Sequence, residues 1–176
     1  EWLEDRLIAS GIGQDEAQAL LGRAALDVRI NRLKVAGALD GLPEAGEALA
    51  LPGALRFPSG TQVMTWEAFE QGRIEVQDLG SQAACMAVGA KPGETVIDLC
   101  AGAGGKTLAL AAAMGNEGTL IAADTDKRRL SQLGPRAERA GVQIVTEVLL
   151  DPGKEADALQ AWLGEADRVL VDAPCS

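Results

Sequence analysis

A glycine-rich stretch that follows an apolar run sets the strongest limit on how this chain can fold. Residues 95–97 are Thr-Val-Ile, residues 98–107 are Asp-Leu-Cys-Ala-Gly-Ala-Gly-Gly-Lys-Thr, and residues 108–114 favour a helix. A strand that stops at an acidic residue, turns through glycines and opens a helix lets a nucleotide-like ligand lie against bare backbone. The stretch therefore predicts a ligand site at the carboxyl end of a strand.

The second half of the chain alternates between strand-like and helix-like segments. Apolar runs at 95–100, 119–123, 143–148 and 168–172 are separated by helix-favouring runs at 108–114, 127–140 and 159–163. Strands that are nearly all apolar indicate a parallel sheet covered on both faces. We expect an α/β fold containing the first four parallel strands of a right-handed, doubly wound, Rossmann-like half-sheet.

The first part of the chain has a different pattern. Residues 1–35 favour one or two helices followed by an alternating strand at 26–30, and residues 37–72 are rich in glycine, proline and short apolar runs. This pattern is typical of a small α+β domain with several turns. We therefore divide the chain into an N-terminal α+β domain, 1–72, and the first part of a larger α/β domain, 73–176.

Composition excludes several classes of protein. Hydrophobic residues make up 47% of the 176 residues, which is ample for a core, and the net charge of −10 gives no global attraction for nucleic acid. Histidine is absent and the three cysteines are widely spaced, so neither a zinc site nor a disulfide framework is indicated. No apolar run is long enough to span a membrane. We expect a soluble, cytoplasmic, monomeric protein without a metal.

The glycine stretch fits three kinds of site to different degrees. Gly105-Lys106-Thr107 ends like a P-loop, with Asp172 available as its magnesium-linked acid, but Cys100 stands where that motif needs glycine. A dinucleotide-binding motif needs glycine where Thr107 stands. An S-adenosylmethionine site requires only that the acid at the strand end orients the amino-acid moiety while glycines allow close backbone approach.

Two further acids follow the next apolar runs, and each has two interpretations. Asp124 lies about 20 residues beyond the glycines, where a carboxylate accepts hydrogen bonds from ribose hydroxyls, but it is also placed to cap a helix that starts near Thr125. Asp151 is placed to accept a hydrogen bond from an adenine amino group, but Asp151-Pro152-Gly153 also resembles an ordinary turn.

Several motifs in order resemble the Sun/Fmu-type RNA cytosine-5 methyltransferases. The resemblance covers most of the chain, and the residues that carry it are Trp2-Leu3, Val28-Arg29-Ile30-Asn31, Leu33-Lys34, Val76 to Gln82, Lys91 to Glu94, Asp98 to Thr107 and Asp172-Ala173-Pro174-Cys175-Ser176. Ala103 departs from the pattern, because members often carry proline there. This change is expected to alter loop stiffness more than chemistry.

The resemblance implies S-adenosylmethionine as cofactor and RNA, expected to be rRNA, as substrate. The residues of this chain that it implies for cofactor binding are Cys100, Ala101, Gly102, Ala103, Gly104, Gly105, Lys106, Asp124, Arg129, Asp151 and Asp172. In the mechanism that it implies, a cysteine adds to carbon 6 of cytosine, carbon 5 takes the methyl group, and loss of the carbon-5 proton releases the cysteine. Asp172, Cys175 and Lys106 are the implied catalytic residues, with Asp172 bonding the cytosine ring and Cys175 assisting product release.

The attacking cysteine of that family lies in a later Thr-Cys motif, which does not occur in these 176 residues. We favour a fragment that carries the cofactor half and is inactive alone, because a sheet ending at Asp172 leaves an apolar edge strand uncovered. The alternatives are attack by Cys175 itself, a P-loop nucleotide hydrolase, and an inert cofactor- or RNA-binding module.

The remaining cysteines and the basic residues have modest expected roles. Cys85 is expected in a helix core, and from its position at the end of a buried strand Cys100 is expected chiefly to pack as a small apolar residue. Two basic clusters are candidates for contact with RNA phosphates, although charged clusters on helices are more often simply solvated. They are Arg29, Arg32 and Lys34, and Lys127, Arg128 and Arg129.

Overall fold

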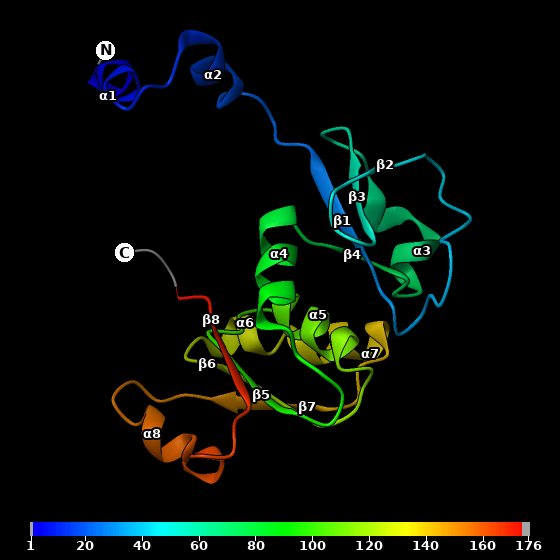
Figure 1. Cartoon of the computed structure of the whole chain (residues 1–176), viewed down its shortest axis with the longest axis vertical. Coiled ribbons are helices and arrows are strands. Elements are labelled where there is room, and N and C mark those ends of the chain that lie inside the picture. Colours follow the sequence, from blue (N-terminus) through cyan, green and yellow to red (C-terminus); the bar gives the residue numbers. More distant parts are fainter. Residues whose placement is uncertain (1, 174–176) are drawn as a thin grey trace.

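The computed structural model of the protein describes residues 2–173 and contains two four-stranded sheets, one after the other along the chain (Figure 1). The first has the strand order β2-β3-β1-β4 and the second β7-β6-β5-β8. Cys175, which carries one of the predicted catalytic roles, lies outside the described residues.

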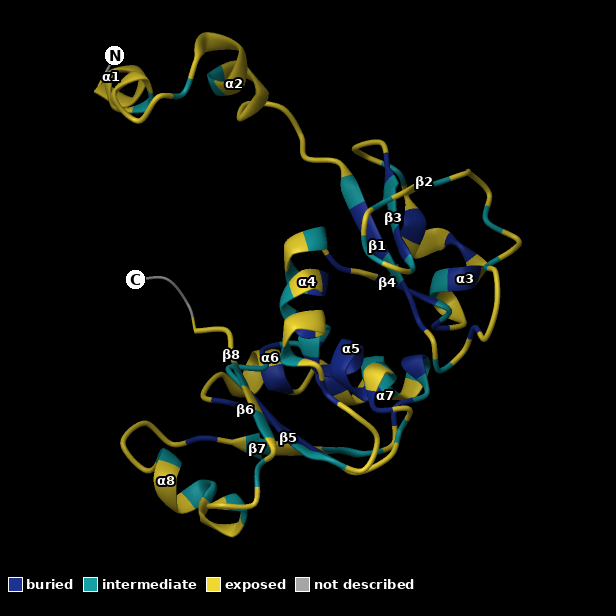
Figure 2. Ribbon diagram, in the orientation of Figure 1, coloured by how far each residue is buried: buried dark blue, intermediate teal, exposed yellow. Residues whose placement is uncertain are grey.

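The first sheet is antiparallel and follows two helices that reach away from it. The helices are α1 (Trp2–Ala9) and α2 (Gln14–Ala19), and neither buries a residue (Figure 2). The strands are β1 (Leu26–Ile30), β2 (Glu47–Ala48), β3 (Ala54–Phe57) and β4 (Ile74–Val76). The short helices η1 (Val63–Thr65) and α3 (Glu67–Glu70) join β3 to β4.

A small apolar core holds this sheet together. Val28, Phe57, Trp66 and Ile74 are buried in it, and the Phe57 and Trp66 rings meet edge to face with centroids 5.1 Å apart. Such ring pairs stabilise a core beyond the area that they bury. Since β4 pairs with β1, this sheet extends past residue 72, and the division of the chain there stays a prediction.

The second sheet is parallel throughout, as the alternating pattern predicts. Its strands are β5 (Thr95–Leu99), β6 (Thr119–Asp124), β7 (Val145–Leu149) and β8 (Arg168–Val171). The helices are α4 (Leu79–Val88), α5 (Gly105–Ala113), α6 (Lys127–Leu130), α7 (Leu133–Ala140), α8 (Glu155–Ala158) and the 3-10 helix η2 (Gln160–Trp162). The predicted Rossmann-like half-sheet is therefore confirmed.

The structure corrects two expectations about this half. The single helix expected over 127–140 is broken between α6 and α7, because Pro135 has no N–H to donate to the Ser131 carbonyl and its ring crowds that carbonyl. The sheet was also expected to be covered on both faces. That cover is present over β5 and β6, where Ile97 and Ile121 are buried, but it is incomplete on the edge strand β8, where Val169 and Val171 are 52% and 57% exposed.

Strand β8 lies at the edge of the sheet next to β5, so the apolar edge expected at the end of the chain is present. The core on the other face is built from α4, α5 and α7 against β5 and β6, with Leu108, Leu110, Leu120 and Leu133 almost fully buried. Because the strands are parallel, the segments after β5, β6 and β8 meet at one edge of the sheet.

Candidate active site

The glycine loop connects β5 to α5 through several unusual backbone conformations. Cys100, Gly102 and Gly104 have positive φ angles of 68°, 56° and 84°. A Cβ on Gly102 would lie 2.5 Å from Nη2 of Arg129, and one on Gly104 would lie 2.1 Å from Cδ1 of Leu133. Glycine suits both positions because it accepts the left-handed conformation, and at Gly104 it also leaves room for the buried Leu133 side chain.

Asp124, at the end of β6, holds this loop in place. Its Oδ2 accepts a hydrogen bond of 2.7 Å from the Gly102 amide, and its Oδ1 accepts one of 2.7 Å from the Asp126 amide. The cap of α6 is Asp126, whose side chain accepts from the amides of Arg128 and Arg129. The alternative role of Asp124 as the helix cap is therefore wrong, and each of its oxygens can still accept a ligand hydroxyl.

Asp98 is a buried carboxylate on β5 beneath the loop. Its Oδ2 accepts a hydrogen bond of 2.6 Å from the Thr107 hydroxyl, while its Oδ1 is buried without a hydrogen-bond partner. Burial raises the pKa of Asp98 to about 6, with the nearby charges of Asp172 and Asp124 acting in the same direction against the Thr107 bond and the Lys106 charge. The free Oδ1 is an acceptor that an ammonium or hydroxyl group of a ligand would satisfy.

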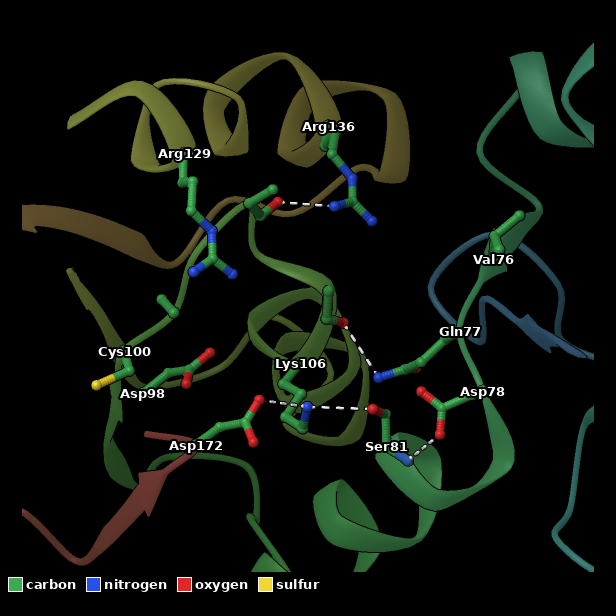
Figure 3. A pocket seen from close by; sticks show the side chains of 13 residues that line it. Val76, Gln77, Asp78, Ser81, Asp98, Cys100, Lys106, Arg129, Arg136 and Asp172 are labelled. Atoms are coloured by element: carbon green, nitrogen blue, oxygen red, sulfur yellow. Dashed lines mark hydrogen bonds and ion pairs between the residues drawn. The ribbon is translucent and has the colours of Figure 1, made fainter. Parts of the chain in front are cut away.

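Lys106 and Asp172 form an ion pair between the start of α5 and the end of β8. The Lys106 Nζ lies 2.6 Å from Oδ2 of Asp172 and 3.1 Å from the Ser81 hydroxyl of α4 (Figure 3). Two side chains that lie far apart in the sequence thus point at one another across the pocket. The lysine fixes the orientation of an acidic group that is itself 55% exposed and accessible to a substrate.

Two adjoining cavities of about 390 and 450 Å³ lie along this edge of the sheet. Cys100, Arg129 and Asp172 line both of them. The first also contains Ala101, Ala103, Gly105, Lys106 and Asp98, and the second contains Asp124. Asp151 lines neither cavity. It is exposed after β7, and its carbonyl accepts from the Lys154 amide in a turn, as its alternative interpretation predicts.

The two cysteines in the described part of the chain are poorly suited to be nucleophiles. Burial raises the pKa of the Cys85 thiol to about 11, and Cys85 lies in the core as predicted. Burial, together with the carboxylates of Asp124, Asp98 and Asp172, also raises the pKa of Cys100. Since the thiolate is the reactive form, neither residue is activated for attack.

The structure also reveals site residues to which the sequence analysis assigned no role. Gln77, Ser81 and Arg136 line the first cavity. Gln77 and Ser81 fall within the segment Val76 to Gln82, which carries part of the family resemblance. The sequence therefore marked this segment but indicated no role for either residue. Arg136 donates a hydrogen bond of 2.8 Å to the Ala103 carbonyl, and no local pattern indicates this contact because it depends on how α7 packs.

The first predicted basic cluster is dispersed. Arg29 donates to the Gln77 side chain, Arg32 donates to the Gly37 carbonyl, and the Lys34 side chain packs beside Gly141. These three residues therefore do not form one patch for RNA phosphates. In the second cluster, Lys127 and Arg128 are exposed on α6, next to Arg129 in the site.

The loop does not have the arrangement of a P-loop. The Thr107 hydroxyl, which would bind magnesium there, is fully buried and donates to Asp98, while Lys106 is paired with Asp172. Residues 2–173 contain no group of three or more potential metal-binding acids or cysteines. No helix within the same residues is long and apolar enough to cross a membrane.

The second sheet is parallel, its glycine loop lacks the arrangement of a phosphate cradle, and an acid stands at the end of the next strand. This combination defines a Rossmann-like S-adenosylmethionine-dependent methyltransferase. The unpaired Oδ1 of Asp98 and the carboxylate of Asp124, which lines the second cavity, fit this cofactor, which carries both an ammonium group and ribose hydroxyls.

The chain belongs to the 16S rRNA methyltransferase RsmB/F family, whose model matches residues 85–176. It is 34% identical, over 192 residues, to the ribosomal RNA small subunit methyltransferase B of Citrobacter koseri, and the match covers 99% of this chain and 42% of that protein. This confirms the expected family, and the chain spans about two fifths of the length of such relatives.

Two solved structures from Pyrococcus horikoshii are similar to this one. A methyltransferase homolog superposes with a TM-score of 0.71 and 27% identity, over 91% of this chain and 53% of that chain. NSun6 with SFG, an S-adenosylmethionine analogue, superposes with a TM-score of 0.57 and 35% identity, over 64% of this chain and 28% of that chain. The expectation of S-adenosylmethionine as the cofactor is thereby confirmed for the family.

Proposed function

We propose that this chain is the cofactor-binding part of an enzyme that methylates carbon 5 of a cytosine in 16S rRNA. The observation that carries this proposal is the Lys106–Asp172 pair, which lies beside the glycine loop; both residues line the first cavity, and Asp172 also lines the second. Family membership supports rRNA as the substrate. The segment 172–176, Asp-Ala-Pro-Cys-Ser, resembles the Sun/Fmu motif, and this resemblance supports cytosine as the target base and carbon 5 as the methylated atom.

Five residues around the glycine loop bind the cofactor in this proposal. Gly102 and Gly104 let the backbone approach the cofactor, Asp124 accepts its hydroxyl groups, and Asp98 accepts its ammonium group. When bound, S-adenosylmethionine supplies an electrophilic methyl group. Arg129 closes the cofactor side of the loop, since its guanidinium lies against Gly102.

Asp172 acts on the substrate side. Lys106 holds its carboxylate in a fixed orientation, so that one oxygen can accept a hydrogen bond from the exocyclic amino group of cytosine. Carbon 5 of cytosine is a poor nucleophile until a cysteine adds to carbon 6. The raised pKa values of Cys85 and Cys100 are consistent with an attacking cysteine outside this chain, and we assign product release to Cys175.

Calorimetric titration of the chain tests the cofactor half of the proposal. We expect S-adenosylmethionine to bind and magnesium-ATP not to bind, and we expect Asp124→Asn to weaken binding by about 1–3 kcal/mol, because it removes a charged acceptor. Asp157→Asn on the exposed α8 is the matched control and is expected to bind as the wild type does. Tight binding of magnesium-ATP alone would support a nucleotide hydrolase instead.

The catalytic half needs the full-length protein that carries this chain. With labelled S-adenosylmethionine and 16S rRNA, we expect nucleoside analysis by mass spectrometry to find 5-methylcytosine. The Cys175→Ala variant is expected to accumulate a covalent protein–RNA adduct, because attack proceeds and release is slow. Loss of the adduct together with methyl transfer would make Cys175 the nucleophile, and a methyl group on any other atom would refute the proposed chemistry.

A further inference from the structure

The strand β4 of the N-terminal sheet reaches the glycine loop of the other sheet through one arginine. The Ala103 carbonyl lies between the two left-handed glycines of the loop and accepts a hydrogen bond of 2.8 Å from Nη1 of Arg136. The same guanidinium donates through Nη2 to Oε2 of Glu75 at 3.1 Å. One planar group therefore connects the loop to β4 (Figure 3 shows the contact with the loop).

Glu75 is an anchor for this arginine. Only 2% of it is exposed, and its other carboxylate oxygen pairs with Arg139, one helical turn further along α7. A buried carboxylate needs such partners, because burial of an unpaired charge is costly. Arg139 differs from Arg136 in two respects: its cationic group stacks over the Phe69 ring at 3.9 Å, and it makes no hydrogen bond to the loop in the described structure.

We infer that Glu75 is a positioning residue for the cofactor loop and acts through Arg136 on the Ala103 carbonyl. This inference rests on the proposed cofactor site. Glu75 does not line either cavity, so it affects a ligand only through the arginine that it holds. The fork geometry of the guanidinium is required, because two hydrogen bonds in different directions must form at once. Gln77, two residues further on, adds a weaker contact of 3.4 Å to the Gly105 carbonyl.

The N-terminal sheet is accordingly part of the apparatus that shapes the cofactor site. Ala103 has no ring that would restrict its backbone, as a proline would. The hydrogen bond from Arg136 supplies a restraint at the same residue. Release of Arg136 from Glu75 is expected to leave the loop with more conformations in the free protein, and a ligand then has to order it on binding.

The test compares three variants of the whole chain by S-adenosylmethionine titration and by thermal unfolding. We expect Glu75→Gln and Arg136→Lys to raise the dissociation constant about ten-fold, because the first loses the charge that aims the guanidinium and the second loses the fork. Arg139→Gln is the matched control. It removes the other partner of Glu75 and is expected to lower the melting temperature while the dissociation constant stays within about two-fold of wild type.

The outcomes separate this inference from the proposed function. If the wild-type chain does not bind S-adenosylmethionine, the proposed site fails. If the wild type binds and Glu75→Gln binds equally well or more tightly, Arg136 acts independently of Glu75 and the inference is wrong. Equal losses of affinity in Arg139→Gln and Glu75→Gln would also overturn it, since a general loss of stability would then explain both. Should Glu75→Gln fail to fold, Glu75→Asp takes its place in the same comparison, because the shorter side chain withdraws the carboxylate from Arg136.

Discussion

Asp98 combines two properties that conflict at neutral pH. Its side chain is almost fully buried, with 1% exposed, and one of its oxygens has no partner in the described structure. A charged carboxylate in that position is unfavourable, which is why its pKa is raised to about 6. Residues with strongly shifted pKa values gather at functional sites, and Asp98 lines the first cavity.

This shift predicts how the stability of the protein depends on pH. The folded state holds the Asp98 proton more tightly than the unfolded state, so the free energy of unfolding falls as the pH rises from about 4 to about 6, and the full cost is present above that range. Asp98→Asn removes the titration. In urea unfolding the variant is expected to be about 3 kcal/mol more stable than wild type at pH 7.5, with no such gain at pH 4. A difference that does not change with pH would contradict this prediction.

At the residue scale the sequence predicts side chains whose place depends only on the local motif. Gly102, Gly104, Lys106 and Asp172 lie where the strand–loop–helix pattern puts them. The sequence does not predict the position of Arg136, because its contact with the loop depends on how α7 packs against elements that are distant in sequence.

At the scale of elements, the start of α5 is fixed by its contact with α7. Gly104 is the N-cap residue of α5, with a φ of 84°, and the Leu133 side chain at the start of α7 is fully buried against it. The two helices can approach this closely only because Gly104 has no side chain.

Gly104→Ala is therefore expected to destabilise the fold by about 2–4 kcal/mol, as the sum of a left-handed alanine and an overpacked contact with Leu133. The control is Gly153→Ala, which has a similar φ of 82° and no atom within 4 Å of its Cβ position. It should lose only the backbone part, about 1–2 kcal/mol. Equal losses for both variants in chemical denaturation would show that the Leu133 contact has no effect.

The same scale shows why strands were easier to predict than helices. The runs that form β5, β6 and β8 are buried or paired along most of their length, so apolar composition alone marks them. The helix expected over 127–140 depends on a single residue, Pro135, which interrupts the backbone hydrogen bonds before α7.

At the scale of the whole molecule, buried polar contacts connect the two sheets. The Asn31 side chain, 1% exposed, donates hydrogen bonds of 2.8 Å to the carbonyls of Gly72 and Ala140, and thus joins the end of β1 to the end of α7. Asp27 of β1 accepts from the Leu79 amide at the start of α4. Neither contact could be predicted from the sequence, because a buried asparagine next to a strand has no distinctive local pattern.

These contacts predict that the two sheets unfold together and that Asn31 couples them. In a background with Trp2 and Trp162 changed to Phe, Trp66 fluorescence reports the N-terminal sheet while far-UV circular dichroism reports the whole chain. The two transitions are expected to coincide in this background.

Asn31→Ala leaves two buried carbonyls without a donor, so we expect stability to fall by about 2–4 kcal/mol and the Trp66 transition to move to lower denaturant. Asn116→Ala is the control, because it removes hydrogen bonds to Gly141 and Gln143 that lie entirely within the part of the chain that contains the parallel sheet. This variant is expected to be less stable, with the two transitions still coincident. Coincident transitions in Asn31→Ala would mean that other contacts suffice to couple the sheets.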